Sequence, residues 1–278
     1  MDSALATLTR VSEDLWQAVQ PLLPGFSVEV VTAIDSTNTE LMRRARSGQH
    51  GPVLLVALEQ TAGRGRRGKA WVSQPGDSLT FSLGLPLAPA DWSGLSLAVG
   101  VGLAEHLHPE IRLKWPNDLW WQGRKLGGIL VETASVGAQR YAVVGVGLNL
   151  ATPTVPMAQG SQGSQGSQAT SEGGVPVAVV PPVGLRALPG EHGARDAGQW
   201  LAALVPALVQ DLLLFERDGF AAFARRFAAL DALVGLQVQL SDGQTGMVAG
   251  VGPGGALRLQ TVRGVVDITS AEVSVRPC

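Results

Sequence analysis

The sequence predicts an α+β protein, in which a mixed β-sheet with flanking helices precedes a small β-structure at the C-terminal end. Up to residue 150, β-branched or continuously apolar runs alternate with stretches of helical length. Beyond residue 230, short β runs alternate with Asp-Gly, Gly-Gly and Arg-Gly pairs, which is typical of a small antiparallel barrel or meander. We therefore expect a large domain over residues 1–230 and a small one over 231–278.

The N-terminal part is expected to contain a short helix followed by a strand. Residues 12–23 have helical composition, with Ser12 as a candidate N-cap. Residues 27–34 (SVEVVTAI) are β-branched and therefore favour an extended strand.

A second helix is predicted over residues 36–48. Thr37 and Glu40 have the spacing of a capping box, and Gly48 is suited to end the helix. The next run, residues 52–60, is continuously apolar, as expected of a strand that is covered on both faces.

The same patterns predict the remaining elements. Further strands are expected at residues 78–85, 111–115, 128–134 and 141–150, and further helices at 95–107, 196–217 and 219–229. Between these, residues 151–195 change in character: they contain the tract GSQGSQGSQ (160–168) and are rich in proline. We expect this segment to be a flexible surface insertion, because its composition cannot bury enough apolar surface to offset the entropy of ordering.

Composition limits the class of protein. The chain has 278 residues, is 45% hydrophobic and carries a formal charge of −2, so a sizeable core is possible and a general attraction to nucleic acid is not expected. The single cysteine, Cys278, excludes internal disulfides and a cysteine metal cage. No signal peptide and no apolar run of membrane-spanning length is recognised. These features predict a cytoplasmic protein that does not use a membrane.

Residues 61–71 (TAGRGRRGKAW) fit two nucleotide-binding patterns, GxGxxG and GxxxxGK, but their context excludes both. A P-loop needs Ser or Thr after its lysine, and here Ala70 follows Lys69. Both motifs also open a helix, which Pro75 and Gly76 prevent.

The composition of this glycine–arginine loop nevertheless suits an anion. Glycines let backbone N–H groups approach a ligand, and four neighbouring cations repel one another unless an anion neutralises them. A solvated surface hairpin explains this one loop equally well. The cations are Arg64, Arg66, Arg67 and Lys69.

Three further stretches favour a functional site over isolated turns. KWPNDLW (114–120) predicts a Pro-Asn-Asp turn, RKLGGILVE (124–132) places a lysine beside a glycine pair that opens a strand, and GVGLNL (145–150) is a strand whose glycines allow close approach. Taken singly, each is also compatible with an ordinary turn, a surface lysine or close strand packing.

Together these motifs resemble one family. DSTN (35–38), EQTAGRGRRG (59–68), KWPND (114–118), RKLGGILVE (124–132) and GVGLN (145–149), in this order, are similar to the biotin–protein ligases. The resemblance is strong over residues 27–150 and continues in the C-terminal β-structure. It implies a class II synthetase-like catalytic domain, an SH3-like C-terminal barrel, and ATP-dependent formation of biotinyl-5′-AMP followed by transfer of biotin to a lysine of a biotin carboxyl carrier protein.

The resemblance also implies the site residues. Biotin would contact Ser36, Thr37, Asn38, Gln60, Gly63, Arg64, Gly65, Arg66, Trp71, Lys125 and Gly128. ATP and the adenylate would contact Arg64, Arg66, Arg67, Lys69, Asn117, Asp118, Lys125, Gly145 and Asn149. The catalytic residues would be Lys125, Arg64, Arg66 and Asp118. Asp118 could bind Mg²⁺ or orient the acceptor amine, and the sequence does not choose between them.

Two alternatives belong to other classes. A lipoate–protein ligase would share the adenylate chemistry, but the glycine–arginine loop and KWPND favour biotin. An RNA-binding loop would need net positive charge and interleaved aromatic residues, and the chain has one Tyr and six Phe. About 25 residues precede the first predicted strand, so we expect no DNA-binding domain and no DNA partner. Either a monomer or a homodimer fits the sequence.

Overall fold

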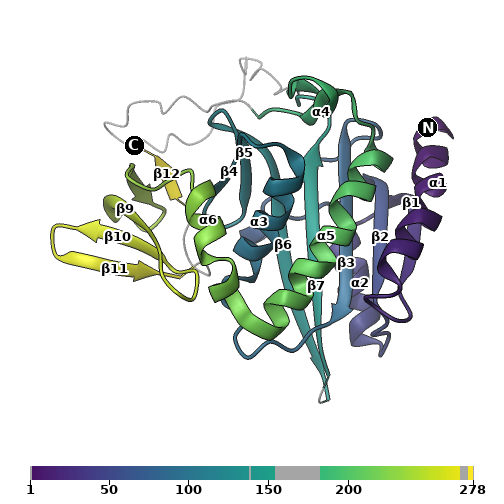
Figure 1. Ribbon diagram of the computed structural model, residues 1–278, viewed down its shortest axis with the longest axis horizontal. Coiled ribbons are helices and arrows are strands. Elements are labelled where there is room, and N and C mark those ends of the chain that lie inside the picture. Colours follow the sequence, from purple (N-terminus) through teal and green to yellow (C-terminus); the bar gives the residue numbers. More distant parts are fainter. Residues whose placement is uncertain (1, 138, 154–181, 270–274, 278) are drawn as a thin grey trace, which may run out of the picture.

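The computed structural model describes residues 2–137, 139–153, 182–269 and 275–277 (Figure 1). Its main sheet has seven strands in the order β1-β2-β3-β7-β6-β5-β4. β1 pairs with β2 in parallel, and the other neighbours pair antiparallel. The strands are β1 (Ser27–Ile34), β2 (Val53–Gln60), β3 (Ser78–Pro86), β4 (Ile111–Lys114), β5 (Asp118–Trp121), β6 (Arg124–Val136) and β7 (Gln139–Asn149). The predicted mixed sheet is confirmed.

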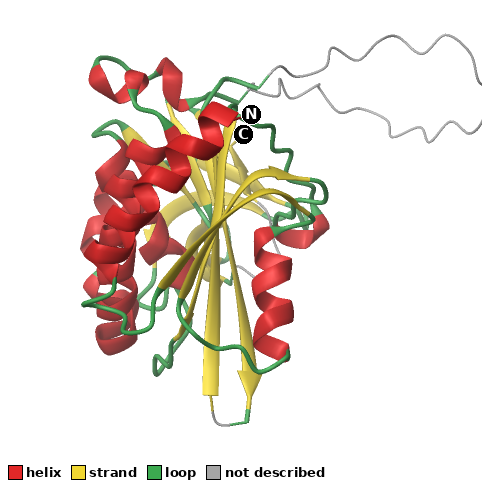
Figure 2. Cartoon of the chain, turned by 90° about the vertical axis from the view of Figure 1, so that its right-hand side faces the viewer, coloured by secondary structure: helices red, strands yellow, loops and turns green. Residues whose placement is uncertain are grey.

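Helices cover the two faces of this sheet unequally (Figure 2). One face carries a layer that includes α1 (Asp2–Val19), α3 (Leu95–Leu107) and α5 (Ala197–Asp218), whereas α2 (Thr37–Arg46) covers the other. Neighbouring residues of one strand therefore enter different cores: Leu54 belongs to the large cluster beneath α3 and α5, and Leu55 to a smaller one beneath α2. Burial on both faces explains why β2 is continuously apolar.

The predicted start of the first helix is wrong. α1 begins at Asp2 rather than at residue 12, and Ser12 lies inside it, where its hydroxyl donates to Leu8 O at 3.0 Å. The apolar stripe, which includes buried Leu8, Leu15 and Val19, extends the helix upstream.

α2 is capped by Ser36 instead of by a Thr37–Glu40 box. The Ser36 hydroxyl accepts the N–H of Thr39 at 3.4 Å. Thr37 is already helical, so its side chain is available for contacts with the sheet.

β5 was not predicted, because Pro-Asn-Asp was interpreted only as a turn. β5 and β6 form a hairpin through Gln122 and Gly123, whose φ angles of 49° and 73° fit a two-residue turn of type I′. This hairpin brings Asp118 next to the start of β6.

The predicted insertion at 151–195 is too long at its C-terminal end. Residues 154–181, including the GSQ tract, lie outside the described residues. Beyond them, Val183, Leu185 and Leu188 are buried in the large core, because this proline-containing segment retains apolar residues that pack. Val183 N–H donates to Lys125 O at 2.9 Å. The segment includes η2 (Leu185–Ala187) and α4 (Glu191–Ala194).

The helix predicted at 196–217 is confirmed as α5 (Ala197–Asp218), but its apolar length was not recognised in the sequence. The stretch 197–222, which comprises α5 and η3 (Gly219–Ala222), is long and apolar enough by length and composition to cross a membrane. It packs against α1 and α3, and Trp200, Leu204 and Leu208 are almost fully buried there. A buried core helix accounts for its composition. α6 (Ala224–Leu230) follows it.

A separate five-stranded antiparallel sheet follows α6, as predicted. Its order is β11-β10-β9-β8-β12, with β8 (Gln237–Leu240), β9 (Thr245–Val251), β10 (Leu257–Thr261), β11 (Gly264–Ile268) and β12 (Val275–Pro277). It contacts the main domain through Trp115, whose indole N–H donates to Gly255 O at 3.0 Å and whose side chain is 1% exposed. This sheet therefore lies against the turn that carries Asn117 and Asp118.

Candidate functional site

A cavity opens between the start of α2, the end of β2, the glycine–arginine loop, the KWPND turn and strands β6 and β7. The cavity has a volume of about 190 Å³ and is open to solvent on one side. Most of the predicted site residues line it: Ser36, Thr37, Asn38, Gln60, Arg64, Gly65, Arg66, Arg67, Lys69, Trp71, Asn117, Asp118, Lys125, Gly128 and Gly145. Gly63 and Asn149 are not among its lining residues. The motifs therefore converge in space, although they span more than 100 positions in the chain.

One end of the cavity is a buried network of polar side chains. The Gln60 side-chain oxygen accepts from the Thr37 backbone N–H at 2.7 Å and lies 3.1 Å from the Thr37 hydroxyl. Ser82 Oγ, from β3, lies 2.7 Å from Thr37 Oγ1 and 2.6 Å from Asn38 Oδ1. All four residues are buried, so their positions are fixed before any ligand enters. Ser82 was not predicted, because its only signal in the sequence is a polar residue inside an apolar strand.

Two glycines of β7 make room for this arrangement. A Cβ at position 145 would lie 2.1 Å from Asn38 Oδ1, and one at 147 would lie 2.5 Å from the Trp71 indole. Gly145, which lines the cavity, thus also accommodates the Asn38 side chain, a packing role that was not predicted. Gly147, which seats Trp71 in the same way, was missed.

The glycine–arginine loop is a compact turn. Trp71 N–H donates to Gly63 O at 2.9 Å, and Gly65 N–H donates to Lys69 O at 2.7 Å. A Cβ at Gly63 would lie 2.4 Å from Trp71 O, so this glycine is required by the turn and does not line the cavity. Within the loop, η1 (Arg66–Gly68) includes Arg67 in the left-handed region, at φ 56°.

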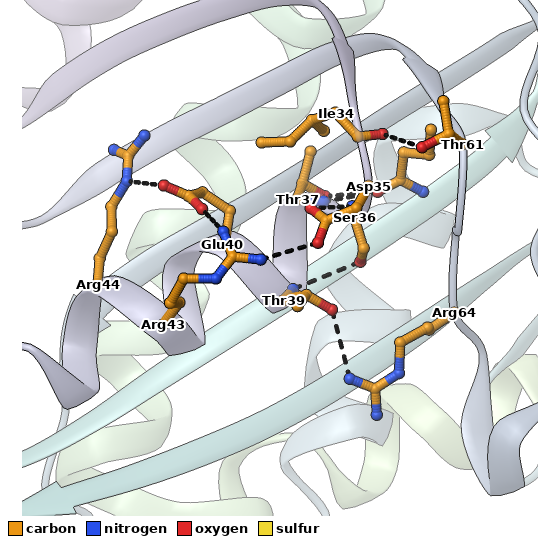
Figure 3. Close-up of polar contacts among 11 residues, drawn as sticks. Ile34, Asp35, Ser36, Thr37, Thr39, Glu40, Arg43, Arg44, Thr61 and Arg64 are labelled. Atoms are coloured by element: carbon orange, nitrogen blue, oxygen red, sulfur yellow. Dashed lines mark hydrogen bonds and ion pairs between the residues drawn. The ribbon is translucent and has the colours of Figure 1, made fainter.

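The two arginines assigned to phosphate have different surroundings. Arg64 is half exposed and lies over the start of α2, with Nη1 3.4 Å from Thr39 Oγ1 (Figure 3) and Nη2 3.5 Å from Glu132 Oε1. Arg66 is more enclosed, with Nη1 3.5 Å from Asn117 Oδ1. Burial lowers the pKa of Arg66, and the Asp118 carboxylate opposes that shift. An enclosed guanidinium is well suited to an anionic ligand.

Asp118 is held between two lysines. Lys125 Nζ lies 2.5 Å from Asp118 Oδ1, and Lys114 Nζ lies 3.9 Å from Oδ2. Asn117 fixes the turn by donating from its amide to Ile129 O at 2.7 Å. Asp118 is the carboxylate among the residues that line the cavity, and the cations are Arg64, Arg66, Arg67, Lys69, Lys114 and Lys125. This imbalance makes the cavity electropositive in a chain whose formal charge is −2.

Asn149 lies at a second cavity next to the first. Its side-chain amide donates to Val183 O at 3.1 Å and so holds the segment that begins at residue 182 against the end of β7. Trp71 and Lys125 line both cavities. The site therefore has two compartments that meet at these two side chains.

The chain was compared with known proteins. Residues 30–149 match the model of the biotin/lipoate A/B protein ligase family. The bifunctional ligase/repressor BirA of Escherichia coli is 34% identical over 264 residues, which cover 91% of this chain and 75% of that protein. The biotin–[acetyl-CoA-carboxylase] ligase of Paracoccus denitrificans is 34% identical over 251 residues, or 86% of this chain and 96% of that protein. The chain belongs to the biotin protein ligase family.

A solved biotin protein ligase has the same fold. The enzyme of Aquifex aeolicus, in complex with biotin and ATP, superimposes with a TM-score of 0.69 and 26% identity, covering 90% of this chain and 99% of that one. The resemblance read from the five motifs is therefore confirmed, and the biotin protein ligase fold accounts for both the seven-stranded sheet and the small C-terminal sheet.

Proposed function

We propose that this protein activates biotin with ATP to form biotinyl-5′-AMP and then transfers biotin to a lysine of a biotin carboxyl carrier protein. The observation that carries the proposal is the place of Lys125 and Trp71, where the two cavities meet. If biotin binds in the first cavity and ATP in the second, the biotin carboxylate and the α-phosphate of ATP meet beside Lys125.

The polar network suits the ureido ring of biotin. Ser36, Thr37, Asn38 and Gln60 offer hydroxyl and amide groups at the buried end of the first cavity, while Trp71 provides an apolar wall. With the ring there, the carboxylate of biotin extends toward Lys125 and the arginines. The second cavity, lined by Trp71 and Asn149, would take the adenosine part of ATP.

The chemistry follows from the charges. A carboxylate oxygen of biotin forms a bond to the α-phosphorus of ATP, and the bond to pyrophosphate breaks with its electron pair leaving on pyrophosphate. Lys125, Arg64 and Arg66 reduce the repulsion between the two anions and stabilise the charge that develops. In the second step the neutral amine of a carrier lysine attacks the acyl carbon, loses a proton and displaces AMP.

We assign Asp118 chiefly to positioning Lys125. Its carboxylate already faces two ammonium groups, which makes it a weak primary ligand for a cation. Mg²⁺ is usually bound by substrate phosphates together with one or two carboxylates, so we propose that it enters with ATP and that Asp118 is the protein group available to it. When bound, Mg²⁺ would neutralise phosphate charge.

We further propose that the C-terminal sheet is an SH3-like barrel. Its buried side chains form an apolar interior, which supports a small barrel; they are Val238, Leu240, Val248, Leu257 and Leu259.

We also propose that the protein acts in the cytoplasm without a DNA or membrane partner.

A pyrophosphate-release assay tests the function. Release should require both biotin and ATP, and a carrier domain should raise turnover by consuming the adenylate. Lipoate in place of biotin serves as the discriminating arm. Release with lipoate but not with biotin would contradict the proposal and favour a lipoate ligase.

A further inference from the structure

Glu132, in the middle of β6, connects two parts of the site without lining the cavity itself. Its Oε2 accepts the Asn38 side-chain amide at 3.0 Å, and its Oε1 lies 3.5 Å from Arg64 Nη2. Asn38 belongs to the buried polar network, and Arg64 belongs to the glycine–arginine loop. One carboxylate thus contacts the first turn of α2 and the loop that folds over the cavity.

The geometry on the Asn38 side is well determined. Its amide N–H₂ group donates to Glu132 and to Leu130 O at 3.1 Å, and its oxygen lies 2.6 Å from Ser82 Oγ. Because both donor hydrogens face β6, the amide oxygen faces Ser82 and cannot exchange places with the nitrogen without losing these contacts. Glu132 therefore helps to orient a residue of the buried polar network that we propose holds the biotin ring, which we call the ring site.

On the other side, Glu132 limits where Arg64 can lie. The Arg64 side chain is half exposed and contacts Thr39, in the first turn of α2, and Glu132, on β6. The Arg64 backbone pairs with Ala70, which closes the loop. Holding the Arg64 side chain therefore holds one edge of the loop against the ring site.

We infer that Glu132 is a positioning residue for biotin activation: it couples occupation of the ring site, through Asn38, to the placement of the glycine–arginine loop, through Arg64. The inference deepens the proposed function and rests on it for the identity of the ligand. The tether itself can be tested on the ligand-free protein.

The first experiment is hydrogen exchange of the ligand-free chain. The amides of Gly65, Lys69 and Trp71 donate within the loop and report its order. In Glu132→Gln, which keeps an acceptor oxygen for Asn38 but removes the charge that faces Arg64, these amides should exchange about two- to fivefold faster, the range expected for a partly exposed ion pair. Glu29→Gln is the matched control. Glu29, on β1, forms an ion pair with Arg44 of α2 at 2.8 Å, and this pair does not involve the glycine–arginine loop. Equal exchange in all three proteins would overturn the tether.

The second experiment is a double-mutant cycle on kcat/KM for biotin. Glu132→Gln should lower kcat/KM about two- to fivefold, mainly through KM, in the parent background and by less than about twofold in an Arg64→Met background, because the effect passes through Arg64. The same loss in both backgrounds would mean that Glu132 acts on the fold or on Asn38 alone and would overturn the coupling. A parent chain that does not activate biotin would instead contradict the proposed function, and the exchange experiment would still decide the tether.

Discussion

The ammonium of Lys125 lies 2.5 Å from the Asp118 carboxylate because the β5–β6 pairing is irregular. The register shifts between Leu119 and Trp120, so Asp118 is opposite Gly128 while Lys125 is opposite Trp120. The lysine side chain reaches back over Gly128, where a Cβ would lie 3.5 Å from Nζ. The shift in the ladder thus places one cation where the two cavities meet.

Lys125→Ala should reduce the rate of adenylate formation by about 10² to 10³, since it removes an oriented charge from the reacting centre. The side chain is 42% exposed, so the free energy of unfolding should change little. Pyrophosphate release and urea unfolding measure the two effects. An unchanged adenylation rate would remove Lys125 from the catalytic residues.

Asp118→Asn should lower the same rate about 10- to 150-fold, the equivalent of one charge-assisted contact of about 1.5 to 3 kcal/mol. If Asp118 acts by positioning Lys125, adding Asp118→Asn to Lys125→Ala should cost little more, because residues that act as a unit are not additive. A rate restored by high Mg²⁺ would instead make metal binding its main role.

Arg66→Gly should let the adenylate escape roughly 10- to 150-fold faster, since it removes an enclosed guanidinium and adds chain freedom to the loop. Escaped adenylate would biotinylate lysines of an unrelated protein. The dissociation rate of pre-formed adenylate and the labelling of a lysine-rich bystander are the measurements. Arg263→Gly, in an exposed turn of the C-terminal sheet, is the control and should label no more than the parent.

Gly147→Ala should weaken binding of both biotin and ATP, because the new methyl group displaces the Trp71 indole, which lines both cavities. An overpacking cost of about 1 to 3 kcal/mol would raise Kd about 5- to 150-fold. Calorimetric titration with each ligand measures this change. At Gly51, a Cβ has no neighbour within 4 Å. Gly51→Ala should therefore bind as the parent does, and equal affinities for both variants would show that Trp71 adjusts freely.

Asp231→Asn should stabilise the fold at neutral pH. Burial raises the pKa of Asp231, so its contribution to stability is present below the unfolded pKa of about 3.9 and is lost as pH rises through the folded value. The gain from the substitution should thus be absent at pH 3.5 and present at pH 7 in urea unfolding. Asp242 accepts an N–H two residues on, as Asp231 does, but is exposed, and Asp242→Asn should show no such dependence. A gain of equal size at both pH values would contradict the assignment to charge burial.

Local sequence signals were sufficient where the pattern is long. Leu95–Leu107 was predicted to the residue, and the buried strand β2 to within one residue. β5 was not, since a strand of four residues that follows Pro-Asn carries little pattern of its own. Its hairpin with β6 decides its conformation.

The residues proposed for the site come from the family motifs, but a motif does not give each of its residues a role: Glu132 ends RKLGGILVE (124–132) and was not assigned. Ser82 and Glu132 were missed because their roles depend on partners distant in sequence: Ser82 meets Asn38 44 positions away, and Glu132 meets Asn38 94 positions away. The packing role of Gly145 was missed, because only the folded sheet shows which side chain occupies the space it leaves.

The unequal covering of the main sheet has a consequence for how the molecule opens. The buried polar network lies at the start of α2. This helix packs on the smaller cluster, whereas α1, α3 and α5 share the large core; the smaller cluster consists of Leu41, Met42, Ala45, Val53, Leu55, Tyr141 and Val143. Fewer buried contacts mean a lower free energy for local opening. Local unfolding of α2 would abolish ligand binding while the rest of the molecule stays folded. A bound ligand would therefore raise the free energy of this local unfolding.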